Sequence, residues 1–142
     1  MTQSNPADSI RVLIVEDHEL VRRALKKLIQ RSSVSTWCGE AASAEAALDL
    51  IPECRPQLVL IDISLPGMNG IELIHVLHEK YPDLWLLALS AHDESVYGVR
   101  AIEAGAHGYV MKEKVDKVLE AIRQVSNGHL YVSDALRAVL GE

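Results

Sequence analysis

No long hydrophobic run occurs in the sequence. A helix that spans a membrane needs about 20 consecutive apolar residues, and the apolar runs here, such as residues 84–89, are far shorter. The first residues also lack the apolar region of a secretory signal peptide. We therefore expect no contact with a membrane and a location in the cytoplasm.

Cysteines are few, and positive charge is not in excess. The two cysteines, Cys38 and Cys54, lack the CxxC spacing of a redox or metal motif, so we expect ordinary reduced thiols. The formal net charge of −6 at pH 7 argues against direct binding of this chain to nucleic-acid phosphates. A cation or a protein partner suits this charge better.

The sequence also lacks internal repeats and low-complexity segments, apart from the polar residues 1–9, which predict a loose tail. A chain of 142 residues, of which 49% are hydrophobic, is typical of one globular domain with a full core.

Strand and helix patterns alternate along the chain. Short apolar runs predict five strands, at residues 10–15, 34–41, 58–62, 84–89 and 107–111. Helical spacing of apolar residues predicts helices at residues 18–30, 43–52, 71–81, 93–104 and 115–125, the second of them closed by Pro52. This alternation predicts an α/β fold, with a doubly wound parallel sheet that has helices on both faces.

Two smaller expectations concern a helix near the C-terminus and the start of the first helix. Ser133 is typical of the cap of one more short helix, with an apolar stripe that includes Leu136 and Val139. We expect this helix either to fray or to pack against a neighbouring chain, and we favour fraying because a helix this short is marginal alone. His18 stands where the first helix begins, beside the predicted site; tuning of access to the site is one reading, and capping of the helix is the simpler one.

Chemically active side chains stand at the carboxyl end of four predicted strands: Glu16 and Asp17, Asp62, Ser90, and Lys112. In a doubly wound sheet these ends converge on one edge. Three carboxylates repel one another unless a cation holds them, and an all-oxygen site suits Mg²⁺. A hydroxyl and an ammonium nearby suit the oxygens of a phosphoryl group.

Asp62 has the most rigid surroundings of these residues. It follows the apolar run 58–61, which reads as a strand buried on both faces, and precedes a turn that contains Pro66, Gly67 and Gly70. For Asp62 alone a loop cap would be the simpler reading, but together with the other acids, the hydroxyl and the ammonium at the strand ends it suggests that a carboxylate attacks phosphorus and forms an aspartyl phosphate.

Several motifs together resemble the receiver domain of bacterial two-component response regulators: VLIVEDH at 12–18, LID at 60–62, LPGMNG at 65–70, LSA at 89–91 and GYVMK at 108–112. The resemblance covers residues 10–128. It implies a flavodoxin-like, five-stranded sheet in the order 2-1-3-4-5, and a phosphorylation-controlled signalling protein rather than an enzyme.

The resemblance also implies a phosphoacceptor and a Mg²⁺ site. The acceptor is Asp62, and the metal ligands are Asp17, Asp62 and the backbone carbonyl of Ser64, with Glu16 acting through water. Glu16 departs from the family's usual Asp at this position by one methylene.

Further roles follow from the same resemblance. Ser90 and Lys112 contact the phosphoryl oxygens together with the backbone N–H groups of Ile63 and Ala91, and the orientation of Tyr109 follows Ser90.

The motifs EDH at 16–18, AGAHGY at 104–109 and SNGHLYVS at 126–133 are similar to those of the NarL/FixJ-type subfamily, in which a linker and a LuxR-type helix-turn-helix follow the receiver. Residues 129–142 would begin that linker, and no DNA-binding half is present. The implied partners are a sensor histidine kinase and a second copy in a phosphorylation-dependent homodimer. The alternative is a stand-alone single-domain response regulator that acts through protein–protein contacts.

Three rival functions are weaker. A phosphohydrolase with an aspartate nucleophile usually has a second Asp two residues on, where this chain has Ser64. A flavodoxin-like binding protein would need a Gly/Ser/Thr phosphate loop after the first strand. A receiver that no longer takes up phosphate would have lost Asp17 or Lys112, and both are present.

Overall fold

The computed structural model describes residues 9–141 and contains one parallel five-stranded sheet in the order β2-β1-β3-β4-β5. Its strands are β1 Ile10–Val15, β2 Ser35–Ala41, β3 Leu58–Asp62, β4 Trp85–Ser90 and β5 Gly108–Met111. This confirms the predicted fold class and strand order. Of the tail predicted for residues 1–9, only Ser9 lies within the described residues, and its buried hydroxyl is hydrogen bonded to Thr36.

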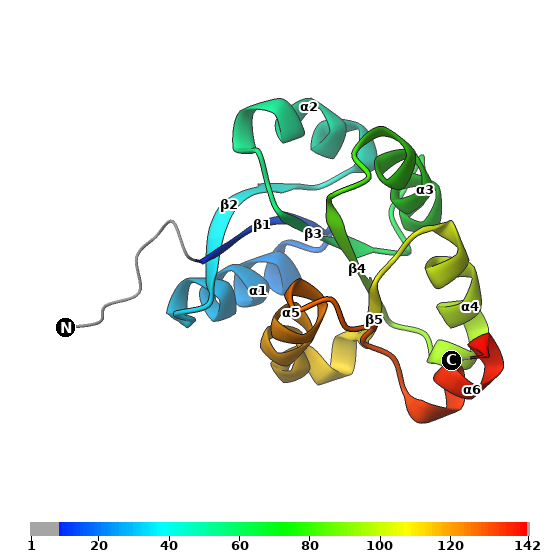
Figure 1. Cartoon of the computed structure of the whole chain (residues 1–142). Helices are drawn as coiled ribbons and strands as arrows, with labels where there is room; N and C mark the ends of the chain where they lie inside the picture. The colour runs from blue at the N-terminus through cyan, green and yellow to red at the C-terminus, as the bar shows by residue number, and fades with distance from the viewer. Residues whose placement is uncertain (1–8, 142) are drawn as a thin grey trace.

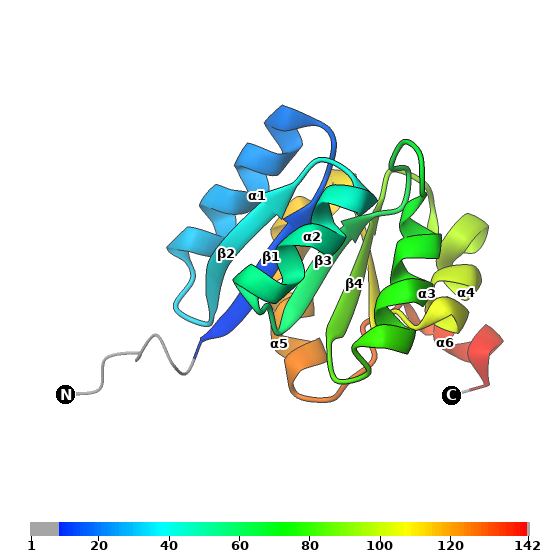
Figure 2. The ribbon, with the colours of Figure 1, turned by 90° about the horizontal axis from the view of Figure 1, so that it is seen from above.

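Helices cover both faces of the sheet (Figures 1 and 2). One face carries α1 (Glu19–Arg31) and α5 (Val118–Ser126), and the other carries α2 (Ala44–Cys54), α3 (Gly70–Lys80) and α4 (Glu94–Ala104). In residues 9–141, no helix has the length and apolar character that crossing a membrane requires.

The sheet separates two hydrophobic cores, because successive strand residues point to opposite faces. Val12 and Ile14 of β1 pack toward α1 and α5, whereas Leu13 and Val15 pack toward α2 and α3. Each fully buried aliphatic side chain contributes roughly 1.5–3 kcal/mol relative to exposure. Strand β3 is buried along its whole length, so the acid at its end stands on the most enclosed strand of the domain.

Side-chain caps fix where the helices on the second face begin. Ser43 accepts a hydrogen bond from the N–H of Ala46 at α2, and Asn69 and Glu72 form a reciprocal capping box at α3. The prediction that Pro52 closes α2 is wrong, because Cys54 is the last residue of the helix. Arg55 follows as its C-cap, in the left-handed region with φ 48°. One lost hydrogen bond in the last turn is tolerated there, since that turn is held by the buried Ile51 and Cys54.

The fifth helix begins later than its apolar spacing indicates. A 3₁₀ segment, η2 (Lys112–Lys117), follows β5, and α5 starts only at Val118. Within η2, the backbone of Lys114 is non-helical, with φ −115° and ψ 45°, so this segment is kinked before α5 begins. The side chain of Lys112 therefore lies on a tight turn directly after the strand.

The C-terminal part of the chain packs against the domain, so the expectation of fraying is wrong. Helix α6 (Asp134–Leu140) lies beside α4 (Figure 1), and Leu136 is buried against Gly98, where a Cβ atom would lie 2.8 Å from Leu136 Cδ2. Ser133 caps α6, and its N–H donates to Glu94 Oε2 at 3.0 Å. Before α6, Tyr131 pairs in parallel with Gly108 of β5.

Replacing Leu136 with Ala should release α6 from α4, because the apolar contact with Gly98 is lost. We expect the amides of 137–141 to be protected from hydrogen exchange in the wild-type monomer and to exchange much faster in Leu136→Ala. Val139→Ala is the matched control, since Val139 is 71% exposed. Equal protection in Leu136→Ala and the wild type would show that Leu136 does not hold the helix.

Candidate functional site

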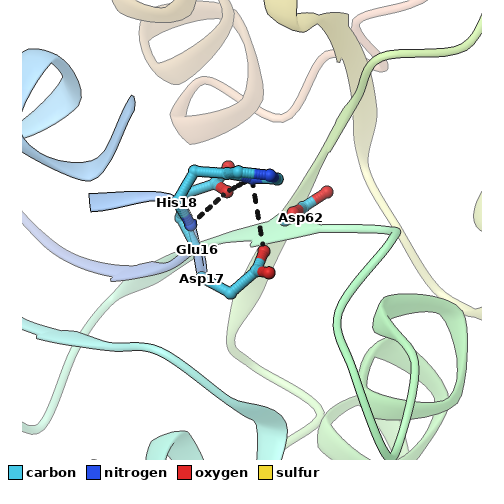
Figure 3. A group of neighbouring side chains, drawn as sticks. All are labelled: Glu16, Asp17, His18 and Asp62. Carbon is cyan, nitrogen blue, oxygen red and sulfur yellow. Dashed lines mark hydrogen bonds and ion pairs between the residues drawn. The ribbon is translucent and has the colours of Figure 1, made fainter. Parts of the chain in front are cut away.

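The carboxyl ends of β1, β3 and β4 place Glu16, Asp62 and Ser90 in the interior, each with 0% of its surface exposed. Asp17 and His18 follow Glu16 at the rim, and their side chains point toward the carboxylate of Asp62 (Figure 3). Burial of charged groups is costly unless other charges or hydrogen bonds compensate it. The surrounding contacts therefore decide what this edge can do.

Lys112 supplies the compensating positive charge. Its Nζ lies 3.0 Å from Asp62 Oδ2 and 3.1 Å from Glu16 Oε1. Burial alone would lower the pKa of Lys112, but its hydrogen bonds to Asp62 and Glu16 outweigh burial and raise it. The ammonium is therefore held charged between two buried carboxylates.

The two oxygens of Glu16 have different surroundings. Oε2 accepts hydrogen bonds from the backbone N–H of His18 at 3.0 Å and from Lys112 Nζ at 3.2 Å, and His18 Nδ1 lies 2.9 Å away. Oε1 is buried and accepts no hydrogen bond, although Lys112 is near it. The side chain of Glu16 is therefore held by the hydrogen bonds to Oε2, whereas Oε1 accepts none.

His18 has a role that sequence reasoning did not assign. It occupies the N-cap position of α1 but makes no side-chain capping bond, so the expectation of capping is wrong. Its Nδ1 instead lies 2.9 Å from Glu16 Oε2 and 3.4 Å from Asp17 Oδ1 (Figure 3). The signal in the sequence was its spacing, directly after two acids at a strand end.

The carboxylate of Asp62 is fixed by its own loop. Oδ1 accepts a hydrogen bond from the N–H of Ser64 at 3.0 Å, a contact the sequence analysis did not name. Burial is the largest influence on Asp62 and raises its pKa to about 6, with a smaller upward contribution from Glu16, despite the opposing hydrogen bonds from Ser64 and Lys112. Gly70 packs directly on this residue, since a Cβ there would lie 2.1 Å from the carbonyl oxygen of Asp62.

Ser90 and Tyr109 both contact the loop between β4 and α4. The hydroxyl of Ser90 accepts a hydrogen bond from the N–H of His92 at 2.9 Å. The hydroxyl of Tyr109 donates to the carbonyl of His92 at 2.8 Å, and the residue is 3% exposed. The serine predicted to read a phosphoryl group and the aromatic predicted to follow it therefore meet the same backbone residue.

Of the two backbone groups expected to contact phosphoryl oxygens, one already has a partner. The N–H of Ile63 donates to the carbonyl of Leu89 at 2.9 Å. It would have to give up that bond to serve a ligand. Ala91 begins the loop after β4 and is exposed.

The acidic residues fit a divalent cation. One ligand atom from each of Glu16, Asp17, His18 and Asp62 lies within 4.8 Å of the others. Among the described residues, Glu16 Oε1 and Asp17 Oδ1 are buried atoms that accept no hydrogen bond. Carboxylate oxygens are the ligands that Mg²⁺ prefers in proteins.

The fold and this edge define a doubly wound α/β protein with a cluster of acidic residues at the carboxyl end of its sheet. The profile of the response regulator receiver domain family matches residues 12–123. The chain therefore belongs to that family and is a NarL/FixJ-like receiver domain of two-component response regulators.

Two curated relatives and one solved structure illustrate the relationship. The chain is 34% identical over 143 residues to the nitrate/nitrite response regulator protein NarL of Escherichia coli strain K12, covering 99% of this chain and 64% of NarL. It is 31% identical over 133 residues to the transcriptional regulatory protein DegU of Brevibacillus brevis, covering 93% of this chain and 56% of DegU. The crystal structure of a two-component response regulator of the LuxR family from Aurantimonas sp. SI85-9A1 superposes with a TM-score of 0.84 at 31% identity, covering 92% of this chain and 94% of that one. The chain thus spans less than two thirds of the length of both curated relatives.

Without metal, the raised pKa of Asp62 should make stability depend on pH. The folded state binds the proton of Asp62 more tightly than the unfolded state. The contribution of Asp62 to the free energy of unfolding is therefore fully present below its ordinary pKa of 3.8 and is lost as pH rises through about 6. In EDTA, the melting temperature of Asp62→Asn minus that of the wild type should therefore increase as pH rises over this interval.

Asp83→Asn serves as the control, because Asp83 is exposed, and its difference from the wild type should be flat. A flat difference for Asp62→Asn would contradict the raised pKa.

Proposed function

We propose that Asp62 is the phosphoacceptor of a phosphorylation-controlled switch. The observation that carries this proposal is its buried carboxylate, which stands at the end of the central strand and is bonded through Oδ1 to the N–H of Ser64 and through Oδ2 to Lys112. An oxygen of Asp62 attacks the phosphorus of a phosphohistidine on a sensor histidine kinase. The new O–P bond forms as the P–N bond breaks, and the leaving imidazole nitrogen takes up a proton.

A Mg²⁺ ion bound at this edge would neutralise charge on the oxygens of the transferring phosphoryl group. We propose that Asp17, Asp62 and the backbone carbonyl of Ser64 hold it, with Glu16 acting through water. Glu16 Oε1 and Asp17 Oδ1, which accept no hydrogen bond, support this assignment.

Lys112 and Ser90 would then bind the phosphoryl oxygens of the aspartyl phosphate. The ammonium already on Asp62 moves to a phosphoryl oxygen, and the Ser90 hydroxyl turns toward another, with the N–H groups of Ile63 and Ala91 as further donors. Because Ser90 Oγ and the Tyr109 hydroxyl both bond His92, a shift of Ser90 alters the backbone that holds Tyr109. This links phosphorylation to a two-state surface on α4, β5 and α5.

The wider setting is part of the same proposal. The chain acts in the cytoplasm as a signalling domain rather than as an enzyme that turns over a substrate, and phosphorylation favours a homodimer. A longer protein of the NarL and DegU kind would use this domain to control transcription, with the segment from residue 129 leading to a DNA-binding domain. This chain itself would not bind DNA, which agrees with its net charge of −6.

Incubation with acetyl phosphate and Mg²⁺ should add one phosphoryl mass to the wild type and none to Asp62→Asn, because the amide is not a nucleophile for phosphorus. Intact-mass spectrometry measures the product. Asp83→Asn, at an exposed position, should be labelled like the wild type. Normal labelling of Asp62→Asn would place the acceptor elsewhere.

Lys112→Ala should be less stable in EDTA and bind Mg²⁺ more tightly than the wild type. Removing one partner of a buried ion pair costs about 3–5 kcal/mol, and here it leaves two carboxylates 0% exposed without their cation. The same ammonium otherwise competes with the metal for these oxygens.

Thermal unfolding with and without Mg²⁺ measures both effects. Lys114→Ala is the control, since Lys114 is exposed on the same turn. Weaker Mg²⁺ binding in Lys112→Ala would show that the ammonium supports the metal site instead of competing with it.

A further inference from the structure

We propose that Cys38 and Cys54 form a modification site, at which a low-molecular-weight disulfide oxidises the folded domain and leaves a reversible bond between the two sulfurs. They are the two cysteines of the chain, and both are free thiols. The inference does not depend on phosphorylation of Asp62, because it concerns the thiols alone.

The fold brings together two cysteines that the sequence keeps apart. Cys38 lies on β2, and Cys54 is the last residue of α2. The Sγ atom of Cys54 lies 3.2 Å from the carbonyl oxygen of Cys38, to which its S–H donates. The thiol of Cys54 is thus already held against the backbone of its partner.

An irregularity in β2 makes this close approach possible. The register with β1 shifts at Cys38, which is an extra residue between the paired Trp37 and Gly39. The side chain of Cys38 packs against the same hydrophobic core as Cys54. Gly39 leaves room for the thiol of Cys54, because a Cβ atom there would lie 2.5 Å from that sulfur.

The backbone at Cys54 is anchored from β1. The guanidinium of Arg11 donates to the carbonyl of Cys54 and, through Nε at 3.2 Å, to the carbonyl of Arg55. The end of α2 is therefore fixed on the sheet, and the sulfur of Cys54 stays beside Cys38 without movement of the helix.

The surroundings of the thiols decide which of them reacts first and how fast. Cys54 is buried, whereas Cys38 is partly exposed, and both line a surface hollow of about 520 Å³. Burial, and after it the neighbouring Cys54, raise the pKa of Cys38 to about 12. Because the thiolate is the attacking form, the pair reacts slowly and stays reduced in a reducing compartment.

The reaction consists of two exchanges. The thiolate of Cys38 attacks one sulfur of the small disulfide, whose S–S bond breaks, and one small thiol leaves with the proton that Cys38 gave up. Cys54 then attacks the Cys38 sulfur of this mixed disulfide and releases the second small thiol with its own proton. The two protein sulfurs are oxidised by two electrons, and the small disulfide is reduced by two. The new bond encloses residues 39–53 and joins β2 to the end of α2.

The test treats folded wild type, Cys38→Ser and Cys54→Ser with excess hydroxyethyl disulfide at mildly alkaline pH and follows the intact mass. The wild type should lose about 2 Da and both titratable thiols, because two hydrogen atoms leave. Cys54→Ser should instead keep a mixed disulfide on Cys38, since no second thiol displaces it. Cys38→Ser should react much more slowly, because its remaining thiol is buried.

Three results for the wild type would overturn the inference. These are an unchanged mass, a mixed disulfide that persists, and disulfide-linked dimers. Each would show that the two sulfurs do not meet within one folded chain.

Thermal unfolding distinguishes a bond made in the native fold from one made after unfolding. A disulfide that fits the fold should raise the melting temperature by about 5–10 °C, because it restricts the unfolded chain, and dithiothreitol should reverse the rise. Cys38→Ser, treated in the same way, should show no rise. An unchanged or lower melting temperature of the oxidised wild type would show that the bond does not fit the native geometry, which also overturns the inference.

Discussion

The ammonium of Lys112, held between the carboxylates of Glu16 and Asp62, is the interaction on which the carboxyl edge of the sheet depends. Both acids are fully buried, and Lys112 is the amine that lies within 3.1 Å of each. Charges this deep are stable only with a partner. A cation that enters this edge must compete with Lys112 for the two carboxylates, and a phosphoryl group that enters must bind the ammonium of Lys112 in their place.

The surrounding fold supports this interaction with backbone rather than with flexible side chains. The N–H of Ser64 holds one oxygen of Asp62, and the N–H of His18 holds one oxygen of Glu16. Gly70 allows the start of α3 to pass directly over the carbonyl of Asp62. An Ala there would have to displace backbone atoms, so the position of Asp62 is fixed by packing as well as by hydrogen bonds.

Much of this could be predicted from the sequence because it rests on periodic patterns. Apolar runs that alternate with helical spacing give the sheet, and the carboxyl ends of parallel strands bring Glu16, Asp62 and Lys112 together. The ring position of His18, the bond between Ile63 and Leu89, and the docking of α6 could not be predicted, because each depends on a rotamer or a tertiary contact. The contact of Leu136 with Gly98, for example, joins helices that are far apart in the chain.

The pairing of Tyr131 with β5 has a consequence for self-association. An edge strand exposes unpaired N–H and C=O groups that can pair with another chain. On β5 and the residue before it, the N–H of Tyr109 and the C=O of His107 face outward, and both are bonded to the backbone of Tyr131, each at 3.0 Å. The chain therefore closes this side of its own sheet, so a second molecule that adds a strand there must first displace the segment around Tyr131.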